Sequence, residues 1–224
     1  MAVPGRVEAA ALLLSLDPPP WFLRHARAVA EVAGWLAARV EAAGRGPDRA
    51  LVEAAGRGPD RALVETAALL HDVDKLDPPG GPSMGLDHGD GSAAWLAAHG
   101  WAALGSAVAA HPVTRLADGP AFDRWLATAP VEDRIVAYAD KRAGQRLESM
   151  DRRFDAWARR YPPHAATPGW GPATVDAIRE RAARLERDVC TLAGVLPGDV
   201  RRLAWTGRAL RTALRVAELG PGPR

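Results

Sequence analysis

Six side chains that can bind a metal ion recur along the chain, and each lies where a helix is expected to face inward or to end. In sequence order they are His25, His71, Asp72, His88, His111 and Asp140. Neutral imidazoles and carboxylates together suit ions such as Mn²⁺, Fe²⁺ or Zn²⁺, whereas Mg²⁺ and Ca²⁺ prefer oxygen ligands alone. The order and types of these residues therefore predict a histidine-rich site for a divalent metal.

His71 and Asp72 form the central pair, because they are neighbours near the end of an expected helix, in the stretch ALLHDVDKL. Neighbouring residues point in different directions from a regular helix, but they can converge where the helix frays. A carboxylate such as that of Asp72 can then contact two ions. Two ions about 3.5–4 Å apart supply a hydroxide at neutral pH and stabilise the attacking and leaving oxygens in phosphoryl transfer.

Each of these residues also has a purely structural interpretation. A lone histidine such as His25 on an apolar helix face is usually a hydrogen-bonded core residue, and His88 and His111 could simply mark helix boundaries. Asp140 lies in an apolar turn, where an unpaired buried carboxylate would be costly, so a metal or another cation is expected beside it. His99 is instead expected to end a helix, where an imidazolium suits the helix dipole.

Two early helices must hold the first ligands. The first is expected over residues 21–39, where one face carries His25, Val29, Val32 and Leu36 at helical spacing. The second is expected over residues 59–75 and brings His71 close to its C-terminal end. A shorter helix over residues 9–16 precedes both and is stopped by three prolines.

The rest of the chain also has helical patterning and no convincing strand. Further helices are expected over residues 92–98, 102–110, 131–159, 173–193 and 199–219. Thr128 is the expected N-cap of the longest of them, with Pro130 in its first turn. Residues 77–87 form a loop rich in proline and glycine, which could serve as a lid over a site. The chain is therefore expected to be all-α.

A perfect tandem repeat separates the first two expected helices. The twelve letters VEAAGRGPDRAL occupy residues 40–51 and again residues 52–63. Solenoid repeats are longer, more numerous and diverged, so this pair indicates a duplication within a connection between helices. The extra copy is expected to form a short helix over residues 47–55, and a longer surface connection is well tolerated.

Composition excludes several classes of protein. The 224 residues are 48% hydrophobic and 25% charged, which is typical of a globular protein, and the net charge of +2 does not indicate a nucleic-acid binder. Cys190 is the single cysteine, so an internal disulfide is impossible, and a small buried apolar role is expected for it. No apolar run reaches the roughly 20 residues that span a bilayer. A cytoplasmic location is the default expectation.

The ordered ligands resemble those of the HD superfamily, whose pattern is His, His-Asp and Asp on a bundle of about five helices. ALLHDVDK is similar to the family's apolar-HD-x-x-K signature, with Lys75 at the lysine position. The resemblance covers residues 21–155. The interval from His25 to His71 is longer than expected by about one twelve-residue copy. The resemblance to the HD superfamily implies an all-α HD-domain helical bundle over residues 1–160. It also implies a C-terminal helical extension, residues 161–224, that packs on the same domain.

The additional histidines resemble those of HD subfamilies that bind two metals. These include bacterial symmetrical diadenosine tetraphosphatases, cyclic-dinucleotide phosphodiesterases and mixed-valence di-iron oxygenases, and DHGDGSAAWL and AYADK look most like the first group. The resemblance implies one ion held by His25, His71, Asp72 and Asp140, and a second held by Asp72, His88 and His111. Fe, Mn, Co, Ni and Zn are the expected metals, and Mg²⁺ is disfavoured at a histidine-rich site.

Basic residues near the ligands are expected to bind phosphate. Asp72 and Lys75 are the expected catalytic residues, with the Lys75 ammonium also contacting a phosphate oxygen or an oxygen of a ligand. Arg142 and Arg146 are spaced i, i+4 on the long expected helix and could clamp a phosphate, and Arg115 is a weaker candidate. Both arginines of that pair could equally belong to a solvated face.

These features predict a metal-dependent phosphohydrolase that cleaves a phosphoester or phosphoanhydride bond of a nucleotide or similar small molecule through a metal-bound hydroxide. Two alternatives keep the same ligands: an HD-type mixed-valence di-iron oxygenase, and a nucleotide-sensing regulatory module without turnover. The apolar faces of the last two expected helices need a partner. That partner is either the bundle itself or a second copy of the chain in a homodimer.

Overall fold

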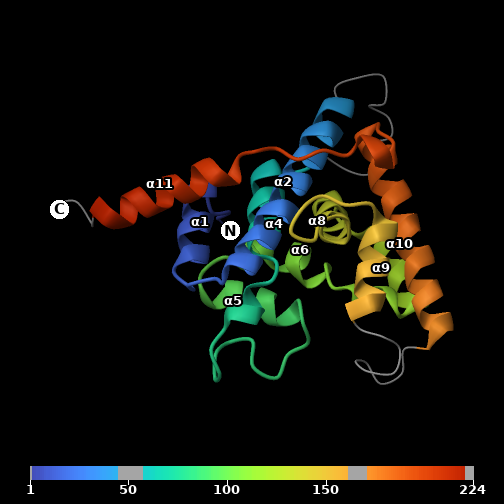
Figure 1. Cartoon of the computed structure of the whole chain (residues 1–224), viewed down its shortest axis with the longest axis horizontal. Coiled ribbons are helices and arrows are strands. Elements are labelled where there is room, and N and C mark those ends of the chain that lie inside the picture. Colours follow the sequence, from blue (N-terminus) through green and yellow to red (C-terminus); the bar gives the residue numbers. More distant parts are fainter. Residues whose placement is uncertain (1, 45–57, 161–170, 220–224) are drawn as a thin grey trace.

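A computed structural model of the chain describes residues 2–44, 58–160 and 171–219, and these residues form a helical bundle (Figure 1). Its α-helices are α1 (Arg6–Leu14), α2 (Pro20–Ala43), α4 (Arg61–Leu70), α5 (Asp90–Ala98), α6 (Gly105–Ala109), α7 (Gly119–Thr128), α8 (Val131–Arg142), α9 (Met150–Arg160), α10 (Pro172–Ala193) and α11 (Thr206–Leu219). Short 3₁₀ helices span Val73–Leu76, Ala102–Leu104, Val113–Leu116 and Pro197–Asp199. The described ranges contain no strand, which confirms the all-α expectation.

Helices α2, α4 and α8 pack against one another at the centre of the bundle (Figure 1). Val29 and Leu36 of α2, Leu69 of α4 and Ile135 of α8 are all fully buried there. The apolar face expected for α2 is therefore the face that contacts the core, and His25 lies on it one turn before Val29. Burying these aliphatic side chains removes apolar surface from water, which is the main favourable contribution to folding.

The prediction of one long helix over residues 131–159 is wrong, because the chain forms two separate helices there, α8 and α9. Helix α8 ends at Arg142, and the backbone N–H of Glu148 donates to the Arg142 carbonyl at 2.8 Å. Gly144 N–H donates to the Arg146 carbonyl at 3.0 Å within the same turn. These bonds replace the helical ladder and let α9 leave in a new direction.

Helix α7 was not expected, and its presence also corrects the predicted cap of α8. Asp118 is the N-cap of α7, with its carboxylate accepting from the Ala121 N–H at 3.0 Å, and Pro120 lies in the first turn. Thr128 is the last residue of α7 and not the N-cap of α8, whose N-cap position is Pro130. An aspartate followed closely by proline is a helix-start signal, so the sequence contained the information.

The described C-terminal residues pack on the bundle. Helix α10 contacts α2 and α8, and α11 lies beside α1 (Figure 1). The expected start of the last helix at Asp199 is wrong, because residues 200–205 are not helical, residues 204–205 form a turn, and α11 begins at Thr206. Leu203 N–H donates to the Glu31 carbonyl at 3.0 Å, and Arg202 pairs with the Glu31 carboxylate at 2.7 Å.

Three further expectations concern the repeat segment, Cys190 and membrane spans. The short helix expected over residues 47–55 falls outside the described residues. Cys190 is buried, as expected, and lies 3.5 Å from the Tyr138 hydroxyl. Within the described ranges, each helix is too short or too polar to serve as a bilayer span.

Asp133 on α8 gives a prediction about stability and pH. Its side chain is buried, and burial raises the pKa of Asp133 to about 6, although the Ser106 hydroxyl donates to it at 3.1 Å. The native state therefore holds this proton up to a higher pH than the unfolded chain, whose aspartate pKa is 3.8. The free energy of unfolding should consequently fall as pH rises from about 4 to about 6.

Asp133→Asn should remove this loss, raising the free energy of unfolding at pH 7.5 by about 2 kcal/mol relative to the unsubstituted chain. At about pH 4 the two proteins should have nearly equal stability. Urea unfolding at both pH values measures the difference. A stability gain of the same size at both pH values would contradict the titration argument.

Candidate metal centre

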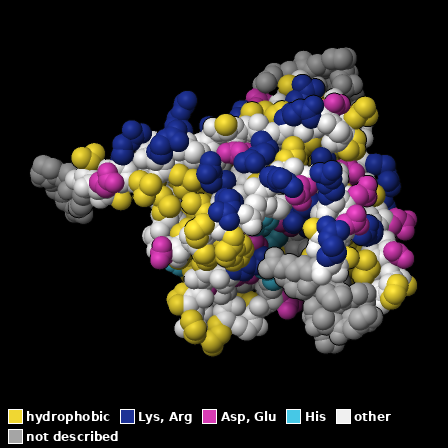
Figure 2. Space-filling view, in the orientation of Figure 1, with side chains coloured by type: hydrophobic (Ala, Val, Ile, Leu, Met, Phe, Trp, Pro, Cys, Tyr) yellow, Lys and Arg dark blue, Asp and Glu magenta, His cyan; other side chains and the backbone are white. Residues whose placement is uncertain are grey.

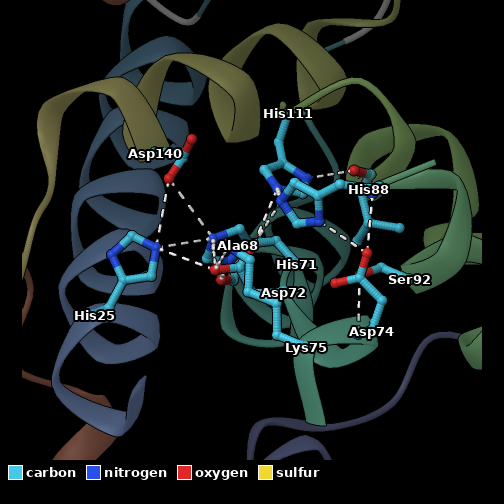
Figure 3. Close-up of polar contacts among 12 residues, drawn as sticks. His25, Ala68, His71, Asp72, Asp74, Lys75, His88, Ser92, His111 and Asp140 are labelled. Atoms are coloured by element: carbon cyan, nitrogen blue, oxygen red, sulfur yellow. Dashed lines mark hydrogen bonds and ion pairs between the residues drawn. The ribbon is translucent and has the colours of Figure 1, made fainter. Parts of the chain in front are cut away.

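The six residues predicted as metal ligands come from five places in the fold and converge on one point (Figure 3). His25 projects from α2, and Asp140 projects from the last turn of α8. His88 precedes α5, and His111 follows α6 directly before Pro112. These positions lie at helix ends or on one inward helix face, so the bundle core holds them in place.

The end of α4 explains how His71 and Asp72 point the same way. Helix α4 stops at Leu70, His71 is its C-cap, and Asp72 has a non-helical backbone (φ −106°, ψ 15°). The chain then continues as the 3₁₀ helix Val73–Leu76 instead of the single helix expected to run to residue 75. This change of backbone lets two adjacent side chains meet the same cluster. Both are almost fully buried, at 0% and 2% exposure.

The orientation of each imidazole is fixed by a hydrogen bond at Nδ1. His25 Nδ1 lies 2.8 Å from the Gly144 carbonyl, His71 Nδ1 2.9 Å from the Ala68 carbonyl, and His111 Nδ1 2.5 Å from the Val108 carbonyl. A carbonyl oxygen only accepts, so Nδ1 carries the proton in each ring. In the neutral ring the lone pair is then on Nε2, which faces the cluster. A hydrogen bond of this kind is typical of histidines that bind metals.

Asp72 divides the cluster into two groups. Its Oδ1 lies 3.1 Å from His88 Nε2 and 3.2 Å from His111 Nε2. Its Oδ2 lies 3.5 Å from the Nε2 atoms of both His25 and His71. Each carboxylate oxygen thus faces a different pair of imidazoles, as a bridging ligand would.

Each pair of imidazoles is itself close. His25 Nε2 and His71 Nε2 are 3.1 Å apart, and His88 Nε2 and His111 Nε2 are 3.0 Å apart. Asp140 Oδ1 joins the first pair, at 3.5 Å from His25 Nε2 and 3.7 Å from His71 Nε2. Three groups of donor atoms could each hold an ion: His25, His71 and Asp140; His71, Asp72 and His111; and Asp72, Asp74 and His88.

The electrostatics of the cluster favour a bound cation. Burial alone would raise the carboxyl pKa values, but the surrounding histidines hold the pKa of Asp72 well below its usual range, and Lys141 and the histidines do the same for Asp140. Burial lowers the pKa of His25, yet hydrogen bonds to Asp140 and Asp72 outweigh it and raise that pKa to about 9. Two buried anionic carboxylates therefore attract either protons or metal ions.

His88 and His111 differ in burial and therefore in pKa. His88 is partly exposed, and its hydrogen bonds to Asp72 and Asp74 overcome the effect of burial and raise its pKa to about 9. His111 is almost fully buried, and burial lowers its pKa to about 4 despite the nearby Asp72. His111 is thus a neutral ligand at physiological pH, which is the form that binds metals.

Asp74 and Lys141 also support the cluster, although the sequence analysis did not single them out. Asp74 Oδ2 accepts from His88 Nδ1 at 2.8 Å and from the Gly89 N–H at 3.1 Å. The Lys141 ammonium is buried, donates to the His111 carbonyl and lies 3.2 Å from Asp140 Oδ2. His99, in contrast, ends α5 and stacks on Trp95, away from the cluster.

The cluster forms one wall of a cavity of about 890 Å³. Figure 2 shows histidine side chains recessed in a hollow of the surface, with lysine and arginine side chains beside them. Lys75 lies in the cavity wall, is 44% exposed and donates to Asp72 Oδ2 at 2.7 Å. The cavity is within the usual size range of small-molecule sites.

The structure separates the three predicted arginines. The i, i+4 clamp is not formed, because α8 ends at Arg142 before Arg146 can follow on the same face. Arg142 is buried and donates to the Tyr138 hydroxyl and to Glu186 of α10, so it is a structural residue. Arg146 lines the cavity and pairs with Glu148 at 3.0 Å. Arg115 pairs with Asp90 and is not part of the cavity wall.

The cavity is also lined by residues that the sequence analysis did not place at the site. Arg153, Phe154 and Trp157 of α9 line the cavity, together with Trp21 from the start of α2. The spacing of Arg153 and Trp157, one helical turn apart, was a usable signal. This spacing was not used in the sequence analysis, because the break before α9 was not expected.

A comparison with known domain families matches residues 22–144 to the HD domain, which is more than half of the chain. The matched segment contains all six predicted ligands. Neither the curated proteins nor the solved structures gave a match. The match and the geometry of the cluster agree: the chain belongs to the HD domain family, most members of which are metal-dependent phosphohydrolases.

Proposed function

We propose that the protein is a two-metal phosphohydrolase that cleaves a phosphoester or phosphoanhydride bond of a nucleotide or a similar small phosphorylated molecule. The observation that carries this proposal is the position of Asp72. Each of its oxygens faces a separate pair of imidazole Nε2 atoms, within 3.1–3.5 Å. A carboxylate shared in this way suits two ions more than one.

The donor atoms fit such ions. His25, His71, Asp72 and Asp140 would hold one, and Asp72, His88 and His111 would hold the other. Four imidazole nitrogens with two carboxylates suit Mn, Fe, Co, Ni or Zn and disfavour Mg²⁺. When bound, a pair of such ions supplies a hydroxide at neutral pH and Lewis acidity toward a phosphoryl oxygen.

The residues of the cavity supply substrate binding. The Lys75 ammonium lies beside Asp72 and is exposed enough to contact a phosphate oxygen as a point charge. Phe154 and Trp21 give the cavity an aromatic surface on which a planar base can pack. A nucleotide uses both features, because it joins a planar base to phosphate groups.

Metal analysis combined with an activity panel tests the proposal. The purified protein is stripped with a chelator, reloaded with Mn²⁺, Co²⁺ or Fe²⁺, and assayed for phosphate release from nucleotides. About two ions per chain are expected, with activity absent after stripping and restored by reloading. The untreated protein is the control for damage caused by the chelator.

Three results would overturn the proposal. Metal binding with oxygen consumption on Fe²⁺ and no phosphate release would identify a di-iron oxygenase. Nucleotide binding without product would identify a sensory module. A protein that binds no metal under any of these conditions would exclude all three functions.

A further inference from the structure

Arg153 on α9 lies close to the ligand His25. An ideal Cβ placed on Gly144 would approach Arg153 Nη1 to 3.1 Å, so the guanidinium packs directly over that glycine. The carbonyl of the same glycine accepts from His25 Nδ1 at 2.8 Å. Arg153 therefore flanks the metal centre, and it lines the cavity together with Asp140 and Lys75.

The other cations around the cavity are already neutralised. Lys75 pairs with Asp72, Lys141 with Asp140, and Arg146 with Glu148. In the part of the chain that the structure describes, Arg153 forms no ion pair, and its Nε is buried without a hydrogen-bond partner. A partly buried guanidinium in this state lacks the compensation that buried charges normally have.

A phosphate group fits what is missing. The planar guanidinium presents several N–H donors in a fork that matches two phosphate oxygens. An anion in the cavity would neutralise its charge and occupy the unused donors. The acidic residues of the centre cannot do this, because Asp72 and Asp140 already face the histidines and lysines.

Arg153 also lies outside the segment shared with the family. The HD match ends at residue 144, and α9 begins at Met150. The metal ligands thus come from the family segment, whereas this wall of the cavity comes from the chain that follows it. A residue in such a position suits selection of the substrate.

We infer that Arg153 is a substrate-binding residue whose guanidinium contacts a phosphate group held against the metal centre. The inference rests on the proposed function, because it places a phosphorylated substrate in this cavity. It assigns to α9 the role that the sequence suggested for Arg142, whose guanidinium is directed toward α10.

Binding of inorganic phosphate tests the inference without requiring turnover. The Mn²⁺-loaded protein is titrated with phosphate by calorimetry, and Arg153→Gln and Arg153→Lys are compared with Arg152→Gln, an exposed neighbour on α9. The Kd for phosphate should rise about 10-fold in Arg153→Gln and less in Arg153→Lys, because lysine keeps the charge and loses the fork. Arg152→Gln should leave the Kd unchanged.

The metal content and melting temperature of each variant exclude indirect effects. An unchanged Kd in a folded, fully loaded Arg153→Gln overturns the inference, as does an equal loss in Arg152→Gln. If Arg153→Gln does not fold, Arg153→Lys decides: an unchanged Kd together with an unchanged KM overturns the inference, and a weaker Kd supports it.

The two proposals fail in different ways. A protein that releases no phosphate from any nucleotide, yet loses phosphate affinity in Arg153→Gln, rejects the hydrolase and retains the phosphate site. If the protein is a hydrolase whose KM and phosphate affinity are unchanged in the Arg153 variants, the proposed function stands and the Arg153 phosphate site is rejected.

Discussion

Asp72→Asn is expected to lower the rate of phosphate release by about 1,000-fold and to reduce the metal content of both groups of ligands. The two oxygens of Asp72 face separate pairs of histidines, and an asparagine keeps an acceptor on one side only. Its amide nitrogen would direct N–H donors at the other pair, where an ion has to bind. The loss of metal assistance is worth several kcal/mol of transition-state stabilisation.

Metal content per chain and kcat under Mn²⁺ measure this effect. Asp176→Asn is the matched control, since Asp176 is an exposed carboxylate on α10 and its replacement should change neither quantity. Asp140→Asn provides a sharper comparison, because Asp140 lies beside His25 and His71 and not beside the pair formed by His88 and His111. This substitution should weaken the binding of one ion and leave the binding of the other unchanged. A fully active Asp72→Asn, or one with both ions retained, would reject the bridging role.

The candidate metal centre was predictable because its residues are rare and chemically specific, and several of them lie at signalled helix ends. His71-Asp72 stands before a loop rich in proline and glycine, and His111 stands before a proline. Such positions can be read from local rules about caps and breakers. The structure brings all six predicted residues to one point, and the two oxygens of Asp72 face separate pairs of the four histidines.

The substrate side of the cavity was not predictable, because it depends on tertiary contacts. Residues 143–149 include good helix formers, and only Gly144 signalled a break. The break is stabilised by distant partners: His25 binds the Gly144 carbonyl, and Glu186 of α10 holds Arg142. Once the helix turns there, helical spacing no longer relates Arg142 to Arg146. The same break brings Arg153 to the cavity.

The last helix shows the same limit. A helical pattern from residue 199 onward was expected, yet residues 200–205 are not helical, and Arg202 and Leu203 bond instead to Glu31 on α2. Glu31 is buried and also accepts from the Thr206 hydroxyl, at the first residue of α11. A contact between residues so far apart in sequence overrides local propensity, which is a weak determinant on its own.

Asp74→Ala is expected to weaken the affinity for one metal ion by about 10–100-fold and to leave the affinity for the other nearly unchanged. A loss of this size is usual when a residue that orients a metal ligand is removed. The Asp74 carboxylate accepts from His88 Nδ1 at 2.8 Å, and so it directs Nε2 toward Asp72 Oδ1. Without it the His88 ring can rotate, and the negative charge that makes the ring a stronger ligand is lost. His25 and His71 depend on backbone carbonyls and should be unaffected.

The graded variant separates orientation from charge. Asp74→Asn keeps an amide oxygen that can accept from His88 Nδ1–H, so its loss of affinity should be smaller than that of Asp74→Ala. Asp87→Asn, at an exposed carboxylate next to His88 in sequence, is the control for a general change in local charge. Competition with a chelating dye gives both dissociation constants in each variant. Equal weakening of both ions in Asp74→Ala would mean that Asp74 stabilises the fold around the centre, because an orienting carboxylate affects only the ion that its histidine binds.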